Sequence, residues 1–167
     1  MKLMKYFMLL VAALGVLSAC ESDLEKVQIL PDDQLVAPVL KDLAVSEVSI
    51  TPENQSEKFV VEWEAAYFGE NIIFNYVLSF THEDNELNVI TGYKKNSVEL
   101  TFGQIQTALV SMGIEANESA DIKLRVSAQV GTTGKILYTD YATLNVIYTL
   151  PEEDNTNEPE NGENTEE

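Results

Sequence analysis

Residues 121–130 read DIKLRVSAQV, and this stretch decides the fold class because its apolar and polar residues alternate. Successive side chains of a β-strand point to opposite faces of a sheet, so this period predicts a strand with one buried face. The set expected to face the core is Ile122, Leu124, Val126, Ala128 and Val130. The set expected to face solvent is Lys123, Arg125, Ser127 and Gln129.

The same period of two recurs along most of the chain and predicts further strands. These are residues 37–40, 46–50, 58–64, 72–81, 87–90, 97–101 and 141–150. Pro38 places the first of them at a sheet edge, where the missing N–H is tolerated. We expect turns near residues 91–92 and at the Gly-Thr-Thr-Gly stretch 131–134, which would join the last two strands.

One segment has helical spacing instead. Thr101 and Gln104 fit a capping box, in which each side chain bonds the backbone N–H of the other residue. Phe102, Ile105, Leu109 and Met112 then follow on one face, and Gly113 is placed to end the helix. The pattern as a whole predicts an all-β fold: an immunoglobulin-like antiparallel β-sandwich of about seven strands with one short crossover helix. Trp63 suits a buried position in its core.

The N-terminus has the features of a secretory signal. Lys2 and Lys5 precede a run of roughly ten apolar residues, which is too short to be a convincing transmembrane span. Leu17, Ser18, Ala19 and Cys20 then resemble the lipobox of bacterial lipoproteins, in which the cysteine is acylated after cleavage in front of it. Cys20 is the only cysteine in the chain. The alternative is an ordinary signal peptide with a chance cysteine.

Four segments follow from this pattern. Residues 1–19 are the predicted lipoprotein signal peptide, 20–36 an acidic flexible tether, and 37–150 the sandwich. Residues 151–167 carry eight acidic and no basic residues, so we expect a disordered acidic tail.

The charge of the chain excludes some functions. Its formal net charge is −18, with 28 acidic and 10 basic residues. Nucleic-acid binding needs clustered Lys and Arg, which this composition opposes. Electrostatic adsorption to anionic lipid is opposed for the same reason. Membrane attachment is therefore expected through acyl chains on Cys20.

Several stretches in order carry a family resemblance. They are the lipobox, the acidic tether, Ala-Pro-Val-Leu at 37–40, a strand containing Trp63, FNYVL at 74–78, the helix with Gly113, IKLRV at 122–126 and LYTDY at 137–141. This order is similar to the N-terminal Ig-like domain of SusE-type outer-membrane lipoproteins of the starch-utilisation system. The resemblance implies a surface lipoprotein beside a TonB-dependent transporter and its partner glycan-binding lipoprotein. It also implies no catalytic activity and a role in retaining polysaccharide.

In that family, the glycan-binding modules lie C-terminal to this domain, so their contacts have no matching positions here. Aromatic residues in loops and at strand ends are the remaining candidates. Tyr93, beside Lys94 and Lys95, and Tyr67 are the weak ligand-binding candidates, and Tyr138 with Tyr141 is another aromatic pair. The alternative is that these rings cover the edges of the core.

No catalytic residue, metal ligand or cofactor is predicted. His82 is the only histidine, and it opens a polar turn, HEDNE at 82–86, that no nucleophile motif accompanies. The spacing of its acids does not match a calcium-binding EF-hand loop. A solvated acidic turn explains the segment better than an enzyme site does.

The sequence thus favours a non-catalytic outer-membrane lipoprotein, accessory to a complex that binds and takes up a starch-like polysaccharide. The expected location is the cell surface, with the periplasmic face as the alternative. The second hypothesis is a structural or adhesive Ig-like lipoprotein module that binds a protein partner and no glycan.

Overall fold

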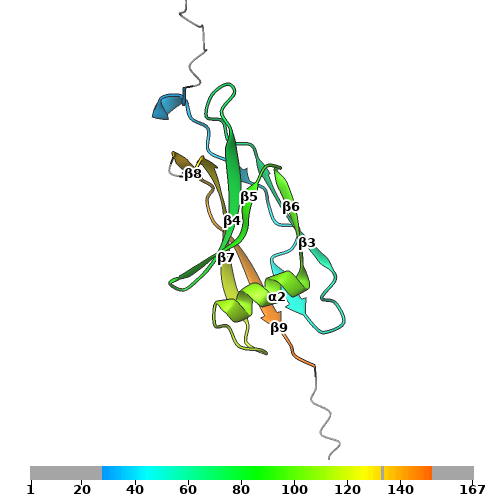
Figure 1. Cartoon of the computed structure of the whole chain (residues 1–167). Coiled ribbons are helices and arrows are strands. Elements are labelled where there is room, and N and C mark those ends of the chain that lie inside the picture. Colours follow the sequence, from blue (N-terminus) through cyan, green and yellow to red (C-terminus); the bar gives the residue numbers. More distant parts are fainter. Residues whose placement is uncertain (1–27, 133, 152–167) are drawn as a thin grey trace, which may run out of the picture.

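The computed structural model describes residues 28–132 and 134–151. Within them, strands alternate with short turns, and one α-helix interrupts the series (Figure 1). The strands are β1 (Val39–Leu40), β2 (Glu47–Ile50), β3 (Lys58–Glu64), β4 (Phe74–His82), β5 (Asn85–Tyr93), β6 (Ser97–Thr101), β7 (Ala120–Val130), β8 (Ile136–Tyr138) and β9 (Ala142–Tyr148). The helices are the α-helix α2 (Phe102–Ser111) and the 3-10 helix η1 (Asp32–Gln34).

The strands form two sheets. One has the order β1-β3-β6, and the other has the order β2-β9-β7-β4-β5 with β8 also paired to β7. Chain order and strand order together match the two-sheet arrangement of immunoglobulin-like sandwiches, so the predicted fold class is confirmed. Two details differ from the prediction. Nine strands are described rather than about seven, and β2 runs parallel to β9, with Glu47 opposite Asn145.

The core lies between the two sheets and follows the alternation in the sequence. In β3, Phe59, Val61 and Trp63 are 3%, 0% and 2% exposed, while their neighbours face solvent. Most of β7 keeps the predicted inward set, and Ile122, Leu124, Val126 and Ala128 are all fully buried. Because these apolar faces meet, the sandwich has one continuous hydrophobic core.

The edge strand β5 is longer than expected. The turn predicted near Thr91 and Gly92 is instead part of the strand, which continues to Tyr93. Gly92 has φ +68, a conformation that glycine adopts without strain, and the pairing with β4 shifts register beside it. The glycine therefore marks a β-bulge, and the connection to β6 falls at residues 94–96.

The C-terminal strands divide in a way that the sequence pattern missed. The turn predicted at residues 131–134 joins β7 to the short strand β8, and Gly134 N–H donates to Val130 O at 3.1 Å. Thr139 follows β8, and its hydroxyl accepts a hydrogen bond from Val126 N–H at 3.0 Å. The next strand, β9, then pairs with β7, as β8 does. Tyr138 and Tyr141 lie on the two sides of this interruption.

Helix α2 confirms the predicted capping box. Gln104 N–H donates to Thr101 Oγ1 at 3.2 Å, and Thr101 N–H donates to Gln104 Oε1 at 2.8 Å. Ile105, Ala108 and Leu109 are buried, and Gly113 follows the helix with φ +82. The helix crosses from β6 in one sheet to β7 in the other, as expected.

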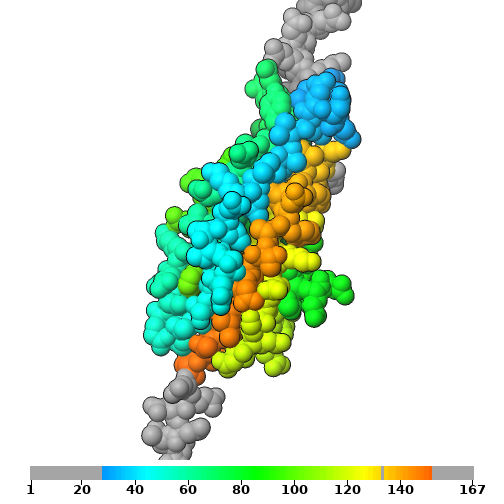
Figure 2. Space-filling view, turned by 180° about the vertical axis from the view of Figure 1, so that it is seen from behind, coloured from blue at the N-terminus to red at the C-terminus, as the bar shows by residue number. Residues whose placement is uncertain are grey.

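The described part of the predicted tether lies against the sandwich. Leu30 N–H donates to Phe68 O at 2.9 Å, and Val36 forms a β-bridge with Tyr67. Within η1, Asp32 forms an ion pair with Lys135 at 2.8 Å. Figure 2 shows this segment along one face, beside the C-terminal strands.

Candidate functional site

The lipidation site lies outside the described residues. The lipobox residues Leu17, Ser18, Ala19 and Cys20 all fall within residues 1–27. Residues 152–167 of the predicted acidic tail also lie outside the described residues. Acylation of Cys20 therefore stays a prediction. No helix in the described part of the chain is long and apolar enough to cross a membrane.

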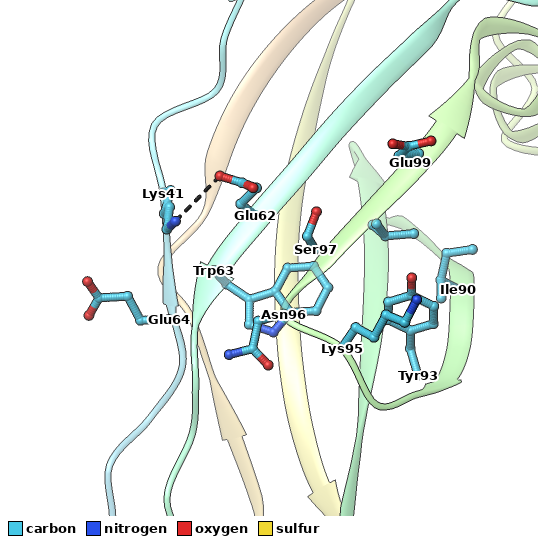
Figure 3. Close-up of a pocket in the computed structure, with 11 residues that line it drawn as sticks. Lys41, Glu62, Trp63, Glu64, Ile90, Tyr93, Lys95, Asn96, Ser97 and Glu99 are labelled. Atoms are coloured by element: carbon cyan, nitrogen blue, oxygen red, sulfur yellow. Dashed lines mark hydrogen bonds and ion pairs between the residues drawn. The ribbon is translucent and has the colours of Figure 1, made fainter.

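A groove of about 1000 Å³ lies beside the β5–β6 connection and contains the predicted ligand residue Tyr93. Residues of β3, β5 and β6 line it, together with Lys41 just after β1 and the β5–β6 connection. They include Glu62, Trp63, Tyr93 and Lys95. Figure 3 shows the indole of Trp63 pointing from β3 toward the turn that carries Lys95 and Asn96. The wall of this groove is aromatic and its rim is charged.

Tyr93 is fixed in the groove by the core. Its ring centroid lies 6.5 Å from that of Trp63, which is in turn packed edge-on against Tyr76 at 5.2 Å. Strand β5 sets this position, because Tyr93 is paired with Tyr76 after the bulge at Gly92. Tyr93 therefore covers a core edge and also lines a groove, and its role in ligand binding stays a prediction.

Trp63 contributes a polar atom that the sequence did not suggest. Its indole N–H is buried and has no hydrogen-bond acceptor among the described residues. An unpaired buried donor costs about 1–3 kcal/mol, so this N–H reduces the stability that the core gains from burying Trp63. Because the sequence pattern placed Trp63 in the core alone, only the structure reveals that it also lines the groove.

The rim of the groove carries paired charges. Lys41 and Glu62 form an ion pair at 3.4 Å, and Lys58 pairs with Glu99. The hydrogen bond and positive charge from Lys58 lower the pKa of the Glu99 carboxyl below its ordinary value. These side chains are about half exposed, so each pair contributes little to stability. Their main effect is to present carboxylate and ammonium groups around the aromatic wall.

Tyr67, the other predicted ligand residue, lies elsewhere. It is 45% exposed and is bridged to Val36 near the point where the chain enters the sandwich. It does not line the groove of Tyr93. The two tyrosines that the sequence proposed as weak candidates therefore do not form one site.

A second aromatic surface surrounds Arg125 on β7. Its guanidinium lies 4.4 Å from the ring centroid of Tyr138 and 5.0 Å from that of Tyr141. Arg125 Nη2 also donates to both carboxylate oxygens of Glu86, each at 3.1 Å. The sequence named the tyrosine pair but missed Arg125 and Glu86. An arginine on the outward face of a central strand was the available signal.

This Arg125 cluster borders a depression of about 630 Å³. Tyr138, Asp140 and Tyr141 form one side, and residues 37–43 form much of the other. Both tyrosines remain about half exposed, at 47% and 48%. The surface thus offers two oriented rings next to a carboxylate and to the backbone of a short edge strand.

The polar turn at His82 joins β4 to β5 on the surface of the sandwich. The ring nitrogen Nδ1 of His82 lies 3.1 Å from the backbone oxygen of Asp121, within hydrogen-bond distance. Across residues 28–132 and 134–151, no group of three or more His, Cys, Asp or Glu residues is arranged to hold a metal ion. The turn joins β4 to β5 and exposes Glu83 and Asp84 to solvent.

The two sheets and their strand order define an immunoglobulin-like β-sandwich module, an architecture that many cell-surface proteins share. The sequence matches the SusE outer membrane protein family over residues 22–127, and the chain belongs to that family. The resemblance inferred from the sequence is confirmed. No curated protein and no solved structure matches the chain. The protein is therefore an outer-membrane protein associated with starch utilisation.

Proposed function

We propose that this protein is a lipid-anchored, non-catalytic accessory component of a polysaccharide-uptake complex at the outer membrane. The observation that carries the proposal is membership of the SusE family, joined to a cysteine at the lipobox position. Residues 1–19 would be removed, Cys20 would carry the anchor, and the sandwich would follow within a short stretch of chain. The natural partners are a TonB-dependent transporter and its glycan-binding lipoprotein.

The anchor follows from the chemistry of acylation. Each buried CH₂ of an acyl chain gives roughly 0.8 kcal/mol, so one chain holds marginally and two or three hold firmly. The net charge of −18 offers no electrostatic attraction to anionic lipid. Attachment to the membrane then depends on Cys20 alone. An accessory to glycan capture would act on the cell-surface side of the outer membrane.

The groove of Tyr93 supports direct but weak contact with polysaccharide. A hydroxyl-rich ligand suits an aromatic wall that is surrounded by carboxylates and lysines. Weak sites are useful on a polymer, because neighbouring sugar units and neighbouring proteins add up through effective concentration. We therefore assign glycan retention to this groove in preference to the Arg125 cluster, because the Arg125 guanidinium already covers the rings of Tyr138 and Tyr141.

Two measurements test the proposal. Cell fractionation of the wild type and of Cys20→Ala should place the first with membranes and release the second. Retention of the mature chain on immobilised starch and on other polysaccharides should fall about tenfold, equivalent to about 1.4 kcal/mol, in Tyr93→Ala. Tyr67→Ala is the matched control, because it removes an exposed tyrosine that does not line the groove.

The outcomes separate the two hypotheses for this chain. Retention on polysaccharide that depends on Tyr93 supports a glycan-binding accessory. Co-purification with a transporter and no retention on any polysaccharide supports a structural module that binds protein. A Cys20→Ala form that remains with the membrane contradicts the anchor.

A further inference from the structure

The loop between β3 and β4 presents one apolar side chain fully to solvent. Gly69 has φ +126 and Asn71 has φ 59, so the backbone turns tightly just before β4. Ile72 is partly buried against the core, whereas Ile73 is 76% exposed, the largest value for a large apolar residue in the described ranges. A single exposed apolar residue is ordinary on a protein surface, so its surroundings decide its meaning.

The segment through which the chain enters the sandwich lies beside this loop. Leu30 N–H donates to Phe68 O at 2.9 Å, and Gln28 O is close to Gly69. Ile29, Val36 and Tyr67 in these segments are 40%, 51% and 45% exposed. We call Ile29, Val36, Tyr67 and Ile73 the entry-end apolar residues.

The two ends of the sandwich differ in their relation to the anchor. Figure 1 places η1 and the β3–β4 loop at one end, and α2 with the end of β9 at the other. Figure 2 shows η1 and the end of β9 at opposite ends from behind. Eight peptide steps separate Cys20 from Gln28, a reach of at most roughly 29 Å. An anchor on Cys20 therefore keeps the entry end close to the lipid surface.

We propose that the entry end contacts the lipid surface, with Ile73 and Ile29 entering the headgroup region. This inference rests on the proposed anchoring through Cys20 and goes beyond it, because it fixes which face of the sandwich is turned to the membrane. The acyl chains supply the affinity, and a weak apolar contact is enough to orient a domain that is already held within reach. The opposite end, with α2 and Leu150, then points away.

Charge decides which lipid the contact prefers. Glu70 lies in the same loop, and Asp32 and Asp33 lie in η1; one of these, Asp32, is paired with Lys135. The remaining carboxylates repel anionic headgroups, so the contact is apolar and favours neutral lipid. This distinguishes it from adsorption by a basic patch.

The test uses the acylated mature protein, which begins at Cys20, reconstituted in phosphatidylcholine vesicles. Since Cys20 is the only native cysteine and would be acylated, Ile73→Cys and Val110→Cys each provide one thiol for an environment-sensitive fluorophore. Val110 is the matched control, because it is 56% exposed but lies on α2 at the far end. We expect a blue-shifted, brighter emission at position 73 and a water-like emission at position 110. The change should be smaller in vesicles that contain phosphatidylglycerol.

Flotation of the labelled protein with the vesicles separates failure of this contact from failure of the anchor. Flotation with equal, water-like emission at both positions overturns the contact and leaves the anchor standing. Loss of flotation overturns the anchor, and the contact with it. A larger change on anionic vesicles overturns the apolar character of the contact. Ile73→Asp should keep flotation while the emission of a label at Ile29→Cys becomes water-like; an unchanged emission would also contradict the proposal.

Discussion

Tyr93 and Tyr138 are both partly exposed tyrosines at strand ends, but different groups lie beneath their rings. Tyr93 packs toward Trp63, a residue that is 2% exposed and belongs to the core. Tyr138 packs on Arg125, whose side chain is 22% exposed and belongs to the outer face of a sheet. The first ring is therefore held by the hydrophobic effect, and the second by a charge that must remain partly hydrated.

This difference predicts how binding and folding are coupled at the two surfaces. A substitution in the Tyr93 groove disturbs the core edge, so it changes stability together with any ligand contact. A substitution in the Arg125 cluster changes a surface that the core does not require. The largest effects on unfolding should therefore come from the groove side.

Trp63→Ala should have the largest effect. It removes a fully buried ring that contacts Tyr76 and Tyr93, and comparable truncations cost about 3–5 kcal/mol. Urea unfolding followed by circular dichroism would measure the loss. If the midpoint of unfolding moved by no more than it does for a surface substitution, the assignment of Trp63 to the core would be wrong.

Tyr93→Ala should come next, at about 1–2 kcal/mol, since its ring is only partly buried against the core. Tyr93→Phe keeps the ring and should restore most of that stability. Thermal unfolding of the two variants separates the ring from the hydroxyl. Equal losses in both would show that the hydroxyl, and not the packing on Trp63, holds this edge.

Much of the fold could be predicted because local rules and burial agree. The inward residues of β3 and most of those of β7 followed directly from the period of two, and the capping box of Thr101 and Gln104 fixed the start of α2. The turn expected at Thr91–Gly92 was wrong because glycine also occurs at a β-bulge, and only pairing with β4 distinguishes the two. Strand β8 is three residues long and has no alternation to detect.

The candidate site was less predictable, because it depends on pairing between distant segments. Tyr93 became a candidate because Lys94 and Lys95 follow it in the sequence. Its contact with Trp63 depends on the register of β4 with β5 and on the packing of the two sheets against each other. Arg125 and Glu86 meet only because β4 lies between β5 and β7. A single sequence shows which face each residue occupies, but it does not show which strand is adjacent.

Arg125→Ala should have a smaller effect on stability than either groove substitution, at about 1 kcal/mol. The ion pair with Glu86 is partly exposed, and Nε of Arg125 has no hydrogen-bond partner among the described residues, so its net contribution is reduced. A double-mutant cycle of Arg125→Ala with Glu86→Gln would give the coupling. The aromatic resonances of Tyr138 and Tyr141 should shift in Arg125→Ala, and unchanged spectra would contradict the cation–π contacts.

The smallest effect is expected at the Glu99 carboxyl on the rim of the groove. The hydrogen bond from Lys58 and its charge hold the pKa of Glu99 below the ordinary value near 4.5. Because the pKa is lowered in the folded state, this pair stabilises the protein above the unfolded-state pKa. That contribution disappears as the pH falls through the folded-state pKa.

In Lys58→Ala, the Glu99 pKa measured by NMR titration should return toward 4.5, while the unfolding midpoint at neutral pH scarcely moves. Lys95→Ala, which deletes a charge on the same groove but outside the pair, is the control. A pKa that moved equally in both variants would show that Glu99 senses the general field of this acidic protein and not its neighbour.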